Sequence, residues 1–209
     1  MDFKLVRPDT FWMGSPPDEV GRKEYESLSE ATILKPFFIG ITKVTQDQYV
    51  AIANTNPSHN RFDGGSHPVE KIRYNDLTGA DGFLVKLNRH FSNNGKAGWK
   101  TILPNKWEAV LPTEAEWEIA CRAGTTTALH NGFDLSNTFE DSNLDPIAVY
   151  GSRTTDTVAK LKPNKWGLYD TLGNVWEWTD KGTLRGGSYR ENAASSRAAS
   201  QIPGQIKSR

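Results

Sequence analysis

Large aromatic rings, rather than aliphatic side chains, must supply much of the core of this chain. Only 36% of its 209 residues are hydrophobic, yet seven are tryptophans, and six of those seven lie from position 99 onward. Eighteen glycines and eleven prolines interrupt the sequence with turns. This combination favours a loop-rich fold packed around bulky rings. Helical bundles and coiled coils are disfavoured, because no apolar heptad repeat is sustained.

Length and charge narrow the class of protein further. The length fits a single domain over residues 1–209, large enough to bury a core without disulfide bonds. Lys and Arg number 25 and Asp and Glu number 25, so a neutral chain is expected to bind neither nucleic acid nor an anionic membrane surface. No apolar run reaches about 20 residues, which predicts no membrane insertion. No signal peptide is visible at the N-terminus, so we expect a cytoplasmic or phage-associated protein.

The only cysteine, Cys121, excludes a disulfide within the chain and a metal site built from several thiolates. Trp117, Ala120 and Cys121 share one face of a helix that the sequence predicts there. We therefore expect Cys121 to be an inert core residue.

Local patterns predict short helices early in the chain and strands with turns later. Thr45 with Gln48, and Thr113 with Glu116, form capping boxes that begin two helices. The predicted helices are 46–53, about 76–91 and 114–123, and the predicted strands are 11–13, 35–41 and 68–72. Residues 16–30 are expected to form a surface loop and 93–98 a turn. Helices before position 124 and strands after it indicate an α+β fold with an irregular, mostly antiparallel sheet.

A series of motifs follows in a fixed order along almost the whole chain. They are Phe11-Trp12-Met13-Gly14-Ser15, 44–49, Asn56-Pro57-Ser58-His59, 111–118, 122–125, Gly167-Leu168-Tyr169-Asp170, 173–178 and Arg185-Gly186-Gly187-Ser188. Together they resemble the formylglycine-generating enzyme family, also called sulfatase-modifying factor domains. The resemblance implies a modified C-type lectin fold with few short helices, much loop and, often, bound calcium.

The resemblance implies a structural calcium ion at the turn 170–177. The implied ligands are the side chains of Asp170 and Glu177 and the carbonyl oxygens of Gly173 and Val175. Two carboxylates across a glycine-containing turn suit Ca²⁺, which takes six to eight oxygen ligands. The alternative is a turn whose carboxylates are solvated or paired with Arg185.

Enzymes of the family use two cysteines shortly after the Gly-Gly-Ser turn, which bind copper(I) and oxidise a substrate cysteine with O₂. The matching positions here are approximately Glu191 and Ser196. Oxygen-bearing side chains cannot replace the soft thiolates that copper(I) requires. We therefore expect the family's copper and its oxidase chemistry to be absent. The four histidines show no spacing typical of a metal site.

These observations favour a non-catalytic module that binds a protein or small-molecule ligand. The fold also resembles that of variable proteins diversified by retroelements, which display changeable residues in and after the Gly-Gly-Ser segment. The predicted binding residues are Trp176, Ser188, Tyr189, Arg190, Glu191, Asn192, Ser195, Ser196 and Ser200. Trp176 is included because the matching family position lies near the substrate groove, although core packing is its default role.

Two other functions stay open. One is an oxidase-type enzyme, either copper-dependent and generating formylglycine from a protein cysteine, or using unfamiliar metal ligands. The other is a structural or regulatory domain of a larger assembly, such as a phage. The C-terminus lacks the usual Asn-x-Gly-Phe-Arg strand of the family. We therefore expect the last strand to be truncated or missing, and 188–209 to form surface loops rather than core.

Overall fold

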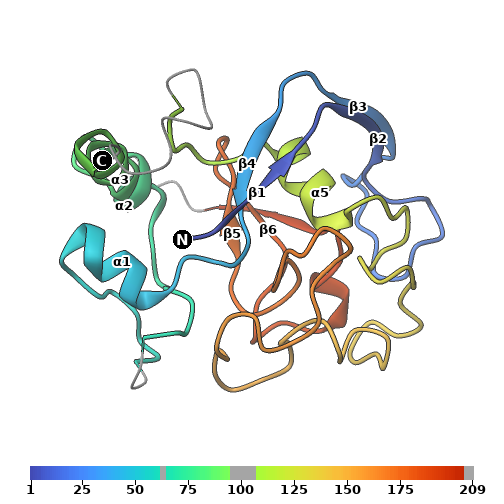
Figure 1. Cartoon of the computed structure of the whole chain (residues 1–209). Helices are drawn as coiled ribbons and strands as arrows, with labels where there is room; N and C mark the ends of the chain where they lie inside the picture. Colours follow the sequence, from blue (N-terminus) through green and yellow to red (C-terminus); the bar gives the residue numbers. More distant parts are fainter. Residues whose placement is uncertain (62–64, 95–106, 205–209) are drawn as a thin grey trace.

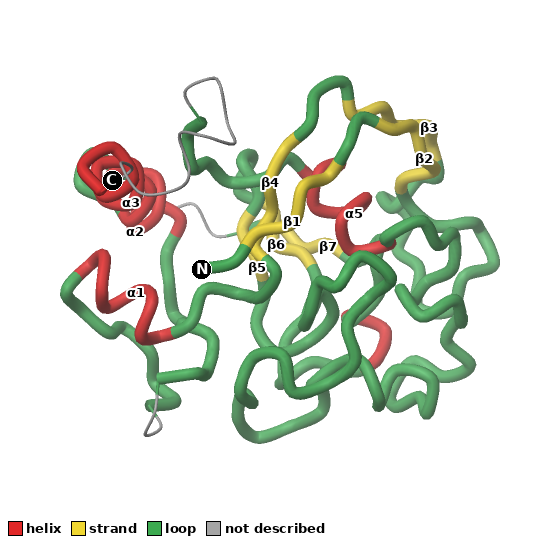
Figure 2. The backbone as a smooth tube through the Cα atoms, viewed as in Figure 1, coloured by secondary structure: helices red, strands yellow, loops and turns green. Residues whose placement is uncertain are grey.

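The computed structural model describes residues 1–61, 65–94 and 107–204, which form short elements joined by long loops (Figure 1, Figure 2). The strands are β1 (Phe3–Val6), β2 (Asp9–Met13), β3 (Ser29–Ile33), β4 (Phe37–Gly40), β5 (Glu177–Trp178), β6 (Thr183–Arg185) and β7 (Gln201–Pro203). The helices are α1 (Gln46–Ala53), α2 (Tyr74–Thr78), α3 (Phe83–Asn94), α5 (Glu114–Arg122) and the 3₁₀ helix η1 (Ala193–Ser195). Few short helices, small sheets and much loop confirm the predicted α+β class.

The strands form three small antiparallel sheets: β1 with β4, β2 with β3, and the three-stranded β5-β6-β7. The strand predicted at 68–72 is wrong, because Lys71 has a left-handed backbone (φ 60°) and Pro68 makes only an isolated bridge to Thr45. The last strand of the described residues, β7, is not the Asn-x-Gly-Phe-Arg strand of the family, so it does not test the expectation about that strand. β7 pairs with β6, placing Ile202 opposite Leu184.

The helices follow their capping signals closely. α1 begins after Thr45 and α5 after Thr113, and both capping boxes are formed. The helix predicted at 76–91 is instead α2 followed by α3. It breaks at Gly79 and Gly82, where a Cβ on Gly82 would lie 2.5 Å from the Leu77 carbonyl oxygen. The turn predicted at 93–98 overlaps the end of α3, and its last four residues lie outside the described ranges.

Among the described residues, no helix has the length and apolarity that crossing a bilayer requires.

The helices α1, α2 and α3 lie together on one side of the molecule, while α5 packs near the sheets (Figure 1). The main core surrounds α5 and combines small and aliphatic side chains with the buried ring of Trp117, and Tyr150 packs against it. Trp12 and Trp107 are exposed, and Trp99 lies outside the described residues. The predicted role of aromatic rings is confirmed for Trp117 and for Trp166, which packs against a second core cluster, but it is wrong for Trp12 and Trp107.

Buried charges join the loops to α5 and to each other. Glu118, fully buried, accepts hydrogen bonds from Arg122 at 2.7 Å and from Arg185, and it also accepts the backbone N–H of Gly14 at 2.8 Å. The Arg185 guanidinium lies 5.1 Å from the Trp117 ring centroid, within cation–π range. One carboxylate thus connects a helix, a strand and the N-terminal hairpin.

The Glu118→Gln variant is expected to lose about 3–5 kcal/mol of unfolding free energy, because two buried guanidinium groups lose their shared countercharge. Equilibrium urea unfolding measures this loss. Glu116→Gln on the same helix is the matched control. Gln also satisfies a capping box with Thr113, so that change should cost less than about 1 kcal/mol. Equal losses for the two variants would contradict the assignment.

Candidate functional site

The predicted site residues fall in two segments that are hydrogen-bonded to each other. The backbone N–H of Gly173 donates to the Gly186 carbonyl at 2.7 Å, and that of Tyr189 donates to the Asn174 carbonyl at 2.8 Å. The turn 170–177 and the segment 186–200 therefore form one structural unit beside the sheet β5-β6-β7.

Asp170 begins the turn in a strained and buried position. Its backbone has φ 55° and its side chain is buried. The carboxylate accepts the backbone N–H of Ala159 at 2.7 Å. Burial raises the pKa of Asp170, and the hydrogen bond from Ala159 and the charge of Lys43 oppose that rise. Asp170 therefore fixes the loop around Ala159 as well as the turn itself.

Glu177, at the other end of the turn, is paired with a buried lysine. The Lys43 ammonium nitrogen lies 2.7 Å from Oε1 of Glu177, and the Lys43 side chain is only 4% exposed. The indole N–H of Trp117 donates to the same oxygen at 3.3 Å. Lys43 was not among the residues predicted at this turn, and Arg185 was the alternative partner expected for its carboxylates. Arg185 instead pairs with Glu118.

These residues do not fit a calcium ion while Lys43 is paired with Glu177. A Ca²⁺ ion bound to Oε1 at about 2.4 Å would lie within roughly 5 Å of the ammonium nitrogen, which is itself 2.7 Å from that oxygen. Two cations sharing one partly buried carboxylate repel each other strongly. The structure places the singly charged ammonium group of Lys43 where the resemblance implies a Ca²⁺ ion.

The segment after the turn starts at two glycines that no other residue replaces easily. Gly186 and Gly187 have φ of 89° and 81°. A Cβ on Gly186 would lie 2.7 Å from the Thr171 carbonyl oxygen, and one on Gly187 would lie 2.7 Å from that of Ser195. The Gly-Gly pair thus allows the segment to pass close to the turn and to η1.

Arg197 anchors the far part of the segment. Its guanidinium is fully buried and pairs with Glu19 and with both oxygens of Glu26, the latter at 2.9 Å each. Glu19 and Glu26 belong to the stretch 16–30, which was predicted to be a surface loop. The prediction is wrong for these two carboxylates, because the buried cation draws them inward.

The predicted binding residues divide into exposed and buried groups. Arg190 and Asn192 are exposed; Trp176, Ser188, Glu191 and Ser195 are half-buried; and Tyr189, Ser196 and Ser200 are buried. The hydroxyl of Tyr189 accepts a hydrogen bond from the Asn60 side chain at 3.0 Å. The expectation that 188–209 forms only surface loops is therefore wrong for the described part, because 196–200 is core around Arg197. Residues 205–209 lie outside the described ranges.

The positions that match the copper-binding cysteines have no thiol. Glu191 is half-buried and Ser196 is completely buried. Cys121 is completely buried in the main core, as predicted, and burial raises the pKa of its thiol to about 12. Within the described residues, no group of three or more His, Cys, Asp or Glu side chains could hold a metal ion.

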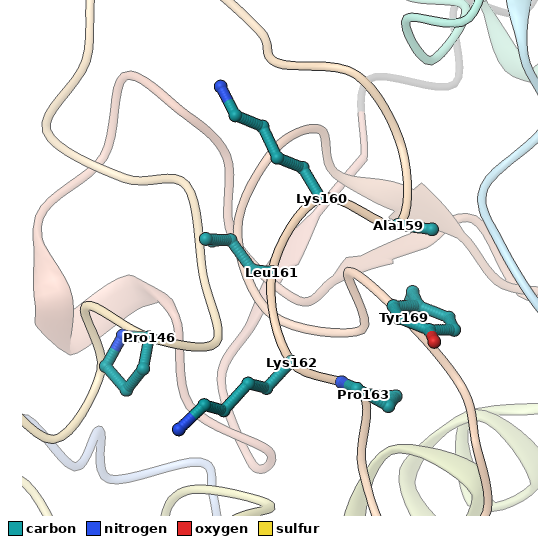
Figure 3. A pocket seen from close by; sticks show the side chains of 7 residues that line it. All are labelled: Pro146, Ala159, Lys160, Leu161, Lys162, Pro163 and Tyr169. Carbon is teal, nitrogen blue, oxygen red and sulfur yellow. The ribbon is translucent and has the colours of Figure 1, made fainter.

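A shallow hollow of about 510 Å³ lies beside the turn and is open to solvent. Its lining residues are Pro146, Ala159, Lys160, Leu161, Lys162, Pro163 and Tyr169. Figure 3 shows the ammonium groups of Lys160 and Lys162 pointing in opposite directions. This hollow has the volume of a ligand pocket but lacks the convergent polar groups that would orient a specific ligand.

Comparisons with known proteins agree on one family. Residues 2–208 match the model described as "Sulfatase-modifying factor enzyme 1-like domain". The formylglycine-generating enzyme of Mus musculus is 38% identical over 134 residues, 54% of this chain and 32% of that protein. The inactive C-alpha-formylglycine-generating enzyme 2 of Mus musculus is 35% identical over 102 residues, 40% of this chain and 32% of that protein. The chain spans about a third of the length of these two relatives.

A solved structure extends the likeness to three dimensions. Treponema denticola variable protein 1 superposes with a TM-score of 0.73 and 25% identity, covering 96% of this chain and 88% of that one. The predicted modified C-type lectin fold is confirmed by such neighbours.

Replacing Arg197 by Met is expected to cost about 3–5 kcal/mol of unfolding free energy, because Glu19 and Glu26 would stay buried without a countercharge. The control is Arg190→Met in the same segment, where an exposed side chain should change stability by less than about 0.5 kcal/mol. Chemical denaturation of both variants measures the difference. A costly Arg190 change would show that the exposed positions also support the fold.

Proposed function

This chain belongs to the sulfatase-modifying factor enzyme 1-like domain family, and on that premise we propose that it is a non-catalytic binding module. Its contact surface would be the exposed part of the segment after Gly187, and its ligand a protein or a small molecule. The observation that carries the proposal is the replacement of both copper-binding thiols by Glu191 and Ser196, on a segment whose backbone is otherwise held firmly.

The geometry of the segment suits recognition. Arg190 and Asn192 project into solvent, while the backbone of Glu191 is fixed by a 2.8 Å hydrogen bond from the N–H of Gly151. Phe139 lies beside this segment, because its carbonyl accepts the backbone N–H of Ala193 at 3.1 Å. Its exposed ring adds apolar area to the surface. A guanidinium, an amide and an aromatic ring on a rigid support are typical of protein contact surfaces.

Two of the named relatives support this interpretation. One is called an inactive formylglycine-generating enzyme, so a domain of this type need not carry the oxidase activity. Another is called a variable protein. We extend the proposal to a diversified segment, in which Ser188, Arg190, Glu191, Asn192 and Ser195 vary while Tyr189, Ser196 and Ser200 support them from inside.

The alternative is a copper-dependent oxidase that converts a protein cysteine to formylglycine. It lacks a ligand pair, because the only thiol of the chain, Cys121, is completely buried in the core. Nothing in the arrangement of the described residues favours this alternative over the binding module.

Aerobic incubation of the protein with copper and a sulfatase-type peptide containing cysteine is expected to leave the peptide mass unchanged. Mass spectrometry of the peptide measures conversion. The variant carrying both Glu191→Cys and Ser196→Cys provides the comparison, and it should gain copper(I) binding in competition with a chromogenic chelator. Formylglycine formation by the unaltered chain would refute the proposal.

The proposal that this segment is diversified can be tested in the genome. Long-read sequencing of the locus should find a second, near-identical copy of the codons for 188–200 close to the coding region. The expected differences between the copies fall on the exposed and half-buried positions, because substitutions there leave the buried residues of the segment unchanged. If no such repeat exists, the segment is not diversified. The proposal of a non-catalytic module is tested separately by the copper experiment.

A further inference from the structure

We propose that the ammonium group of Lys43 takes the place of the divalent cation implied at the turn 170–177, so that this fold needs no calcium there. The proposal is independent of the ligand-binding role of the segment after Gly187. The Lys43 side chain would supply the positive charge at this turn that a calcium ion from solution would otherwise supply.

The lysine is held in place by backbone pairing on both sides. The Ile41 carbonyl accepts the backbone N–H of Tyr169 at 2.9 Å, and the Val44 carbonyl accepts that of Val69 at 2.9 Å. Lys43 lies between these two attachments, with its side chain 4% exposed. A buried ammonium requires a carboxylate partner, and Glu177 provides it at 2.7 Å.

One oxygen of each carboxylate of the turn already has a donor. Oε1 of Glu177 accepts from both Lys43 and the Trp117 indole, and Oδ2 of Asp170 accepts from the backbone of Ala159. The Lys43 charge also acts on Asp170. A divalent cation bound at Oε1 of Glu177 would compete with the buried ammonium for the same oxygen. Within the described part of the chain, Glu177 is the only ion-pair partner of Lys43, so displacement of the ammonium would leave a buried charge without that partner.

The first test compares thermal unfolding of the unaltered protein in excess EDTA and in millimolar calcium chloride. A protein with its own cation at the turn should show a shift in Tm below about 1 °C between the two conditions. A rise of several degrees with calcium, together with stoichiometric binding by isothermal titration calorimetry, would overturn the proposal.

The second test replaces the cation itself. Lys43→Met is expected to lower the Tm in EDTA by about 10 °C, because Glu177 loses its buried partner. Lys43→Arg should stay much closer to the unaltered protein, since it keeps a cation. Lys162→Met, on an exposed lysine, is the matched control and should change the Tm little.

The Lys43→Met variant also separates the two possible cations. With the ammonium removed, calcium chloride should raise its Tm relative to EDTA, although it has no such effect on the unaltered protein. A Lys43→Met protein as stable in EDTA as the unaltered one would show that Lys43 contributes no countercharge, and would contradict the proposed role of its ammonium group. If that variant fails to fold, the calcium comparison on the unaltered protein still decides.

Discussion

Two buried clusters of carboxylates and guanidinium groups are the interactions on which the rest of this structure depends. Glu118 joins Arg122 and Arg185, and Arg197 joins the two carboxylates of the N-terminal loop. The sheets have only two or three strands each, so pairing between strands fixes only a small part of the chain. A buried charge without a partner is costly, and an arrangement of loops that separates these groups is therefore excluded. The ion pairs select one loop arrangement more than they add net stability.

The sequence allowed the local structure to be predicted, and it failed where the decisive partner lies far along the chain. The capping boxes at Thr45 and Thr113 operate over three residues, so α1 and α5 begin where expected. Glu19 and Glu26 resemble an ordinary solvated charge run, and their partner is more than 170 residues away. Glycine spacing was equally ambiguous. Gly79 and Gly82 lie inside the single helix predicted at about 76–91, and in the structure they separate α2 from α3.

In the candidate site, too, features that depend on residue type could be predicted from the sequence, whereas features that depend on packing could not. The absence of thiols at Glu191 and Ser196 is a matter of identity, and it is visible in the sequence. The burial of Ser196 and Ser200 is not, because turns and a 3₁₀ helix have no sustained periodicity from which an inner face can be read. Lys43 gave no signal either. A single lysine before a helix cap acquires its meaning only when Glu177, 134 residues later, is placed beside it.

The separation of Arg197 from Glu19 by 178 residues also orders events in time. A ribosome releases the N-terminal loop long before it makes the arginine that neutralises that loop, so the two carboxylates stay hydrated through most of synthesis. Contacts of such long range close late and slow folding, since the entropy cost of closing the loop comes before the contact is gained. Folding of this domain is therefore expected to finish only after Arg197 has left the ribosome and to be nearly all-or-none, with the segment after Gly187 and the N-terminal hairpin becoming ordered in the same step.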